Sequence, residues 1–225
     1  MPGERTARAP STTRSSPASS GASSPFVQDI DALRRRAREN MEHGAVTHSY
    51  GADRQTVIDV LNAALATEIV CVLRYKRHYF MAQGIASESV KAEFLEHAAE
   101  EQEHADQLCE RIVQLGGEPD LNPEGFAARS HSQYVEGTDL VDMIREDLVA
   151  ERIAIDSYRE IVQWLADRDP TSRRVLEEIL AKEEEHAEDL SSMLQGMGAS
   201  GPDAGRTGAR QSGGNGAGSG NGRES

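Results

Sequence analysis

One short motif, a glutamate followed three residues later by a histidine, occurs twice and constrains the fold more than any other feature. It stands at Glu101 and His104 in EFLEHAAEEQEHADQL, and again at Glu183 and His186 in EILAKEEEHAEDL. Three residues are close to one helical turn, so each pair projects from one face of a helix, where it can hold a metal ion. One copy on a charged helix is weak evidence. Two copies, each preceded by another helix with an inward glutamate, predict a shared metal site.

Apolar residues recur at helical spacing in four long stretches, which predicts four helices. Glycines end the first two stretches, whereas a threonine and an aspartate followed by proline open the last two. The predicted helices span 53–83, 87–115, 138–166 (capped by Thr138) and 170–195 (capped by Asp169). The connection between the second and third helices has two prolines, four glycines and no clear periodicity. A connection this long fits if those two helices are parallel neighbours, because it must then cross the full bundle.

The two ends of the chain differ in composition from this helical body. Residues 1–25 are rich in Ser, Thr, Pro and Ala, and 10 of the 28 residues from 198 to 225 are glycine. We therefore expect a disordered arm over 1–25, a short helix and linker over 26–50, the bundle domain over 51–197 and a disordered tail over 198–225.

Charge is distributed unevenly along the chain. The net charge is −14, yet residues 51–197 carry 14 basic and 31 acidic side chains, so the ends are basic. An acidic body argues against a general nucleic-acid-binding surface and suits a protein that attracts cations. The sequence has no run of 18 apolar residues and no apolar segment of the signal-peptide kind near its start. We therefore expect no transmembrane helix, no membrane partner and a cytoplasmic location.

The inward polar residues form two similar halves. Glu68 precedes Glu101 by 33 residues. In the second half Glu151 precedes Glu183 by 32 residues, so the halves are near repeats of one helix hairpin. A pseudo-twofold axis between them brings four carboxylates and two imidazoles around one point, and buried carboxylates without cations repel one another strongly. The predicted ligands of two divalent ions are Glu68, Glu101, His104, Glu151, Glu183 and His186.

The ligand types suit iron, manganese or zinc and do not by themselves decide between them. Because no thiolate belongs to the predicted set, Fe(II) that O2 or peroxide can oxidise is the leading interpretation. Tyr75 lies on the same stripe as Glu68 and either donates an electron or hydrogen bond near the site or is an ordinary core tyrosine. His97 either supports a ligand or metal route or is an ordinary buried histidine. The acids beside the ligands, including Glu100 and Glu184, are expected to be solvated.

The two cysteines, Cys71 and Cys109, invite the idea of a redox disulfide. With Glu68 and Glu101 level on antiparallel helices, the cysteines are roughly 16 Å apart at about 1.5 Å per residue. That distance exceeds the reach of a disulfide. We expect two free thiols.

Four segments carry a resemblance to a known family, which covers about residues 55–195. ALATEIVCVLRYKRHYF, EEQEHADQL, MIREDLVAERIAIDSY and EILAKEEEHAEDL resemble, in order, the helices of the bacterioferritin branch of the ferritin-like superfamily. The resemblance implies an all-α ferritin-like four-helix bundle with one long crossover between helices 2 and 3. It implies that the six ligands form a ferroxidase di-iron centre, with Glu101 and Glu151 as bridges and Tyr75 as a catalytic tyrosine. The implied function is Fe(II) oxidation with O2 or H2O2 and storage of ferric mineral in an oligomeric shell.

The chain departs from that family pattern in two places. Bacterioferritins bind haem through a methionine after the first glutamate of the helix-two motif, and here that residue is Gln102, so haem is not expected. The short fifth helix of 24-subunit ferritins is replaced by a glycine-rich stretch, which favours a shell of 12 subunits, as in Dps-like proteins.

Two rival hypotheses remain open at this point. DNA protection would use the basic arm with Arg5, Arg8 and Arg14, backed by the cluster Arg34 to Arg38, and a shell would multiply weak contacts. A di-iron oxidase acting on an organic substrate would require a substrate cavity beside the metals.

Overall fold

The computed structural model describes residues 26–84 and 87–199. These residues form helices and loops without any strand, which confirms the expected all-α fold. The predicted disordered arm over 1–25, with Arg5, Arg8 and Arg14, lies outside the described residues. The predicted tail over 198–225 lies outside them from residue 200 on, and its first two residues belong to the last helix. The helical elements are α1 (Ile30–Arg36), η1 (Met41–His43), α2 (Arg54–Met81), α3 (Ser87–Gln114), η2 (Pro123–Gly125), α4 (Phe126–Arg129), α5 (Leu140–Leu165) and α6 (Pro170–Ala199).

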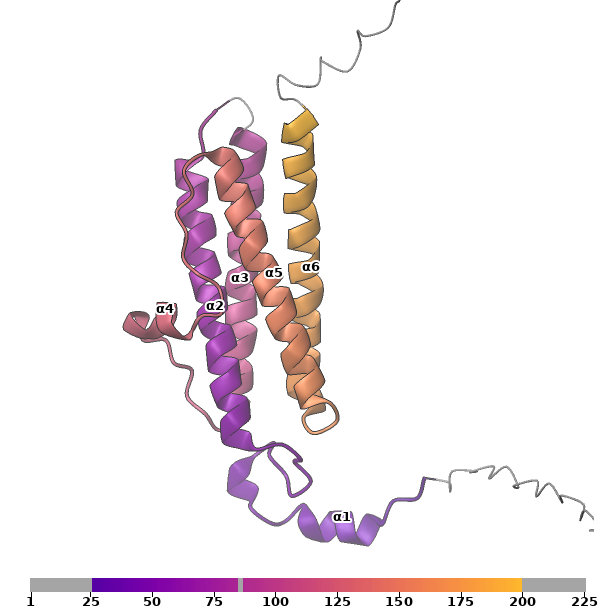
Figure 1. Ribbon diagram of the computed structural model, residues 1–225. Coiled ribbons are helices and arrows are strands. Elements are labelled where there is room, and N and C mark those ends of the chain that lie inside the picture. Colours follow the sequence, from indigo (N-terminus) through magenta and orange to yellow (C-terminus); the bar gives the residue numbers. More distant parts are fainter. Residues whose placement is uncertain (1–25, 85–86, 200–225) are drawn as a thin grey trace, which may run out of the picture.

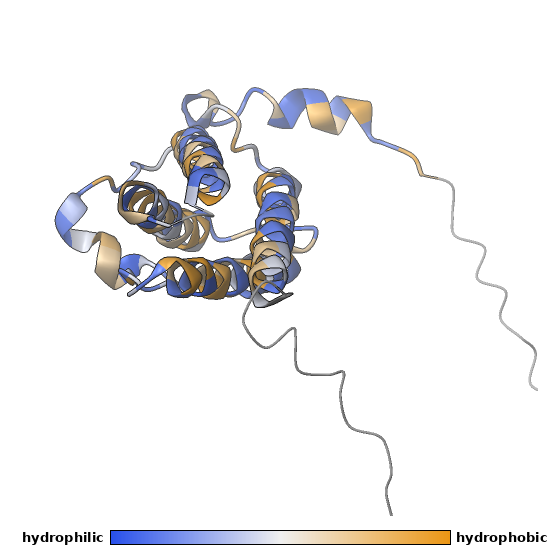
Figure 2. Cartoon of the chain, turned by 90° about the horizontal axis from the view of Figure 1, so that it is seen from above, coloured by the Kyte–Doolittle hydropathy of each residue, from blue (hydrophilic) through white to orange (hydrophobic). Residues whose placement is uncertain are grey.

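The four long helices α2, α3, α5 and α6 lie side by side as a bundle (Figure 1). Figure 2 looks down this bundle and shows the four helices around a common interior, with α1 outside the ring. The chain runs along α2, returns along α3, crosses the bundle length through η2 and α4, and then descends α5 and returns along α6 (Figure 1). Helices α3 and α5 are therefore parallel, as the long connection predicted.

Aspartate side chains cap three of the four long helices. Asp53 accepts a hydrogen bond from the backbone N–H of Thr56 at 2.8 Å at the start of α2. Asp139 accepts from the N–H of Asp142 at 3.0 Å at the start of α5, so the expectation that Thr138 caps this helix is wrong. Thr138 lies one residue too early and instead donates to the Asp142 carboxylate. A carboxylate at the cap also interacts favourably with the positive end of the helix dipole.

A buried ionic network fastens the crossover to the bundle. The Arg74 guanidinium lies 3.0 Å from one carboxylate oxygen of Asp147 and donates to the carbonyl of Gln133 at 2.8 Å. His78 pairs with the second oxygen of Asp147 at 2.7 Å and lies 3.1 Å from the carbonyl of Glu136. The network joins α2, α5 and the crossover, and so sets the level of α5 against α2.

Replacing Arg74 with alanine is expected to lower the free energy of unfolding by about 3 kcal/mol or more, because it leaves the Asp147 carboxylate buried without its guanidinium partner. Arg145 on α5 pairs with Asp142 at 3.6 Å but is 57% exposed, so Arg145→Ala is expected to change stability by less than about 0.5 kcal/mol. Urea denaturation of both variants measures the difference. Equal losses in the two would contradict a role for the buried network.

A second network closes the opposite end of the bundle. Arg111 on α3 pairs with Asp169 at 3.0 Å and donates to the Ser172 hydroxyl at 2.8 Å. Tyr50 donates to the second oxygen of Asp169 at 2.8 Å, and Asp169 also caps α6 by accepting from the Ser172 N–H. One carboxylate therefore links the helix cap, α3 and the segment before α2.

Helix α2 has the length and composition of a membrane-spanning helix. Among the described residues it alone is long and apolar enough to cross a bilayer by length and composition, although the sequence was expected to contain no such stretch. Within its most apolar window 61% of the residues are buried in the protein. Its interior face also carries Glu68 and Arg74, as suits a core helix of a bundle.

Candidate metal centre

All six predicted ligands lie inside the bundle at one level. Each long helix contributes, and every one of the six side chains is between 0% and 4% exposed. An apolar cluster that includes Leu61 and Leu108 lies on one side of them, and a second that includes Phe94 and Leu190 lies on the other. The six residues are thus a polar layer between two apolar layers.

The ligand atoms fall into two groups that share two carboxylates. Within each group all ligand atoms lie within 4.8 Å of one another. One group consists of Glu68, Glu101, His104 and Glu183, and the other of Glu101, Glu151, Glu183 and His186.

Distances to the two imidazoles identify the shared carboxylates. His104 Nδ1 lies 3.4 Å from an oxygen of Glu101 and 3.1 Å from an oxygen of Glu183. His186 Nδ1 lies 3.4 Å from the other oxygen of Glu101 and 3.8 Å from the other oxygen of Glu183. Glu101 and Glu183 therefore each face both imidazoles with separate oxygens.

The geometry differs from the expected bridging pair, Glu101 and Glu151, in its second member. Glu151 lies 4.0 Å from His186 Nδ1, and Glu68 lies 3.4 Å from His104 Nδ1, so each of them faces one imidazole. Glu101 and Glu183 are the two carboxylates that belong to both groups. These two stand at equivalent positions of the two Glu-x-x-His motifs.

The buried polar atoms of the cluster that lack hydrogen-bond partners show that these residues fit a pair of metal ions. Several buried polar atoms of the cluster have no hydrogen-bond partner among the described residues, and such atoms cost about 1–3 kcal/mol each, more when charged. Cations at the centre would satisfy them. These atoms are Glu68 Oε2, Glu101 Oε1, Glu151 Oε2, both carboxylate oxygens of Glu183 and His186 Nδ1.

Burial and close contact shift the pKa values of the carboxyl and imidazole groups in this cluster. Burial, followed by repulsion from neighbouring carboxylates, raises the pKa of Glu68 and of Glu151 well above the usual range. Burial alone would lower the pKa of His104, but hydrogen bonds that the imidazole donates to the surrounding carboxylates, Glu101 first, raise that pKa to about 12. The same competition raises the pKa of His186 to about 9. Both imidazoles are therefore protonated at neutral pH in the metal-free protein.

Metal binding is expected to release about one proton or more per ion at pH 7, and to weaken as the pH falls. A metal needs the lone pair on each imidazole, so His104 and His186 must first lose the protons that their raised pKa values retain. Titration calorimetry with Zn(II) in two buffers of different ionisation enthalpy measures the release. Heats that do not depend on the buffer would contradict the expectation.

Two tyrosines flank the centre in a symmetric arrangement. The Tyr75 hydroxyl donates to Glu151 Oε1, and the Tyr158 hydroxyl donates to Glu68 Oε1. Tyr158 was not among the residues expected at the site. The signal that could have found it is spacing, since Tyr158 follows Glu151 by seven residues, as Tyr75 follows Glu68.

Two further residues contact the ligands. His97 lies 3.2 Å from the Tyr75 hydroxyl through Nδ1, and its ring stacks on that of His186 with centroids 4.0 Å apart. Burial, and then the nearby His186, lower the pKa of His97 to about 4, so its ring is neutral. Glu100, expected to be solvated, is only partly exposed and lies 2.7 Å from His186 Nε2. Glu100 on α3 therefore contacts the imidazole of the opposite motif, on α6.

Both cysteines are free thiols, as the distance argument predicted. Cys71 is buried, with its sulfur 3.6 Å from the Ser132 hydroxyl, and Cys109 is half-buried.

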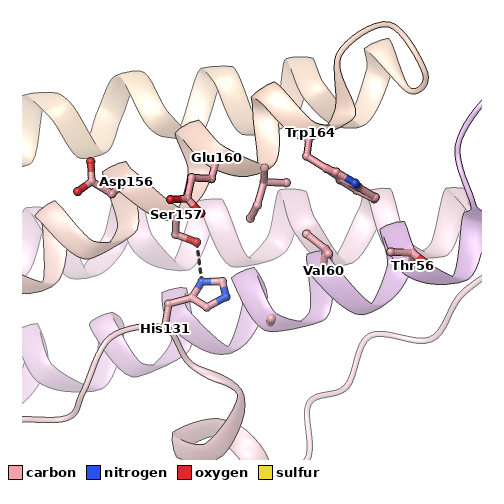
Figure 3. Close-up of a pocket in the computed structure, with 9 residues that line it drawn as sticks. Thr56, Val60, His131, Asp156, Ser157, Glu160 and Trp164 are labelled. Carbon is pink, nitrogen blue, oxygen red and sulfur yellow. Dashed lines mark hydrogen bonds between the residues drawn. The ribbon is translucent and has the colours of Figure 1, made fainter.

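A surface hollow of about 630 Å³ lies between α2 and α5 (Figure 3). His131 and Ser157 meet across it at 2.8 Å, and Trp164 lines its far end (Figure 3). None of its lining residues belongs to the ligand cluster. The hollow therefore gives no support to the hypothesis of an organic substrate beside the metals.

Comparisons with known proteins agree with this geometry. The family model of the ferritin-like domain matches residues 58–198. The bacterioferritin of Brucella melitensis is 32% identical over 141 residues, which are 61% of this chain and 82% of that protein. The DNA protection during starvation protein of Halobacterium salinarum is 31% identical over 167 residues, 71% of this chain and 90% of that protein. The solved dodecameric thioferritin of Bacteroides fragilis, a bacterioferritin-related protein, has a TM-score of 0.65 at 34% identity and covers 67% of this chain and 90% of its own.

Proposed function

The chain belongs to the ferritin-like family, in its bacterioferritin and Dps-like branch, and from this premise we propose that it is a ferroxidase that detoxifies and stores iron. Fe(II) is the substrate. The observation that carries the proposal is the buried layer of four carboxylates and two imidazoles whose free acceptor atoms converge on two adjacent positions.

The proposed ligands divide by role. Glu68 and His104 hold one Fe(II), Glu151 and His186 hold the other, and Glu101 and Glu183 face both. Two Fe(II) supply the two electrons that reduce H2O2, with two protons, to two waters, or that reduce O2, with two protons, to H2O2. The carboxylates balance the added positive charge, and the apolar layers on either side limit the access of bulk water.

Tyr75 is proposed as the catalytic tyrosine, because its hydroxyl contacts a ligand of one ion and the buried His97. Tyr75→Phe is expected to slow Fe(II) oxidation by about tenfold, within the range of a lost outer partner of a ligand, while two ions still bind. Stopped-flow absorbance and a metal count measure the two effects. Tyr158→Phe serves as the symmetric comparison, and identical rates in Tyr75→Phe and the wild type would remove the assignment.

The assembly is proposed to be a homo-oligomeric shell in the cytoplasm, with 12 subunits favoured over 24. The dodecameric thioferritin supports this number. The ferritin-like unit is proposed to span 51–197, close to the matched range 58–198. Haem is not part of the proposal, since Gln102 stands where the resemblance places the haem methionine.

Fe(II) oxidation followed by absorbance in the wild type and in Glu101→Ala tests the function. The wild type is expected to oxidise two Fe(II) per subunit rapidly, and Glu101→Ala to lose this phase because both ions lose a ligand. Equal rates would overturn the proposal. Native mass measurement with metal analysis, before and after iron loading, then distinguishes a mineral store of hundreds of irons per shell from a site that only holds two per chain.

A second candidate function is DNA protection, supported by the Dps-like relative and by exposed arginines on α1. A gel-shift assay comparing the full chain with one lacking residues 1–25 tests it. Loss of the shift on deletion supports the basic arm as the DNA-binding element, and an unchanged shift removes it.

A further inference from the structure

A third group of metal-ligating side chains lies next to the two described above. It consists of Glu93 and His97 on α3 and Asp189 on α6, whose ligand atoms all lie within 4.8 Å of one another. His97 is 1% exposed, and the two carboxylates are half-buried. On α3 the spacing from Glu93 through His97 to Glu101 is four residues at each step, so the group lies on the same face as the centre. On α6, Asp189 follows His186 by three residues.

The two ring nitrogens of His97 face different neighbours. Nδ1 lies 3.2 Å from the Tyr75 hydroxyl, which donates to the Glu151 carboxylate. Nε2 lies 3.4 Å from a carboxylate oxygen of Glu93. The buried imidazole therefore presents its second nitrogen to the carboxylates of the group.

The carboxylates of the group have no basic partner either. Among the described residues no Lys or Arg side chain forms an ion pair with Glu93 or Asp189, although such pairs are frequent elsewhere on the same helices. An imidazole nitrogen and two carboxylates therefore converge at one position without a Lys or Arg partner among the described residues. Oxygen and imidazole ligands of this kind suit Fe(II), Mn(II), Zn(II) and Co(II).

We propose that Glu93, His97 and Asp189 form a third divalent-cation site, between the buried pair and the α3/α6 surface. His97 also groups with Glu151 and His186 within 4.8 Å, so the third site is contiguous with the centre. Its partial exposure gives solvent access that the six ligands lack. The role that follows, a transfer position for Fe(II) on its way to or from the pair, rests on the proposed function, whereas binding at the site does not.

Counting ions in the full-length protein tests the site with Zn(II), which undergoes no oxidation. Native mass spectrometry is expected to show three Zn(II) per subunit in the wild type, the third filling last because its ligands are the most hydrated. Asp189→Asn is expected to retain two. Glu188→Gln removes the same charge from the adjacent exposed residue and is expected to retain three.

Anomalous diffraction from crystals of the Zn(II)-loaded protein is expected to place the third ion at His97 Nε2. Two ions in the wild type, three in Asp189→Asn, or a third ion at another position would each overturn the proposal. A single ion per subunit, located at His97, would support the third site while contradicting the pair on which the proposed function depends.

Discussion

Replacing Glu183 with alanine is expected to slow Fe(II) oxidation by at least about 100-fold and to prevent tight binding of both ions. The reason is geometric, because Glu183 presents one carboxylate oxygen to each imidazole, 3.1 Å from His104 Nδ1 and 3.8 Å from His186 Nδ1. Losing an outer partner of a metal ligand already costs about 10–100-fold, and here a ligand common to both ions is removed. Stopped-flow absorbance and anaerobic metal counts measure the loss.

Two matched variants test whether Glu183 is a ligand of both ions. Glu151→Ala removes a carboxylate that faces His186 alone, so it is expected to retain one tightly bound ion beside His104. Glu184→Ala removes the neighbouring exposed glutamate and is expected to behave as the wild type. The assignment of Glu183 as a bridge fails if Glu151→Ala loses both ions while Glu183→Ala keeps one.

Removing the metal is expected to lower the melting temperature by roughly 10 °C. Ligand at 1,000 times its dissociation constant stabilises the folded state by about 4 kcal/mol, and a domain of this size shifts by about 2–4 °C per kcal/mol. Differential scanning calorimetry with Zn(II) or with a chelator, at one protein concentration, measures the shift. Identical melting temperatures would show that no ion neutralises the buried carboxylates.

Glu68→Gln is expected to be more stable than the wild type without metal and less stable than the wild type with Zn(II). The Glu68 carboxylate is fully buried with one oxygen lacking a partner, and the neighbouring Glu183 and Glu101 oppose its ionisation. Burial and these carboxylates raise the pKa of Glu68, so folding at neutral pH carries the cost of keeping this carboxyl protonated. Glu68→Gln is neutral without that cost, so the metal-free variant is expected to melt above the metal-free wild type by several degrees. With Zn(II) present the wild type is expected to be the more stable. Exposed Glu184→Gln is the control and is expected to show neither change.

The helices and the crossover could be predicted because each leaves a local mark. Gly84 and Gly116 stop helices, apolar residues repeat at helical spacing, and a connection of that length has few uses other than joining parallel neighbours. The convergence of the six side chains could be predicted because three-residue spacing puts each Glu-x-x-His pair on one helix face and the hairpin repeat adds Glu68 and Glu151. Spacing does not say which carboxylate oxygen faces which imidazole, so it could not show that Glu183, rather than Glu151, faces both imidazoles.

Contacts between residues that are far apart in the sequence have no such local pattern and could not be predicted. Glu100 reaches His186 across 86 residues, and Arg74 reaches Asp147 across 73. Glu100 was expected to be solvated, and Arg74 was not singled out, because nothing adjacent in the sequence distinguishes either residue. The cap at Asp139 was missed by one residue, which is the usual uncertainty of a helix boundary.

The split of the ligands between two hairpins has a consequence for the newly made chain. The α2–α3 hairpin carries Glu68, Glu101 and His104, and the α5–α6 hairpin carries the other three. Each hairpin can form from local contacts, whereas their docking must close the long crossover and is the slower event. Until docking, either half offers two carboxylates and one imidazole, half of what a pair of ions needs. Under the proposed function, a chain that has not finished folding therefore offers Fe(II) only half of the site.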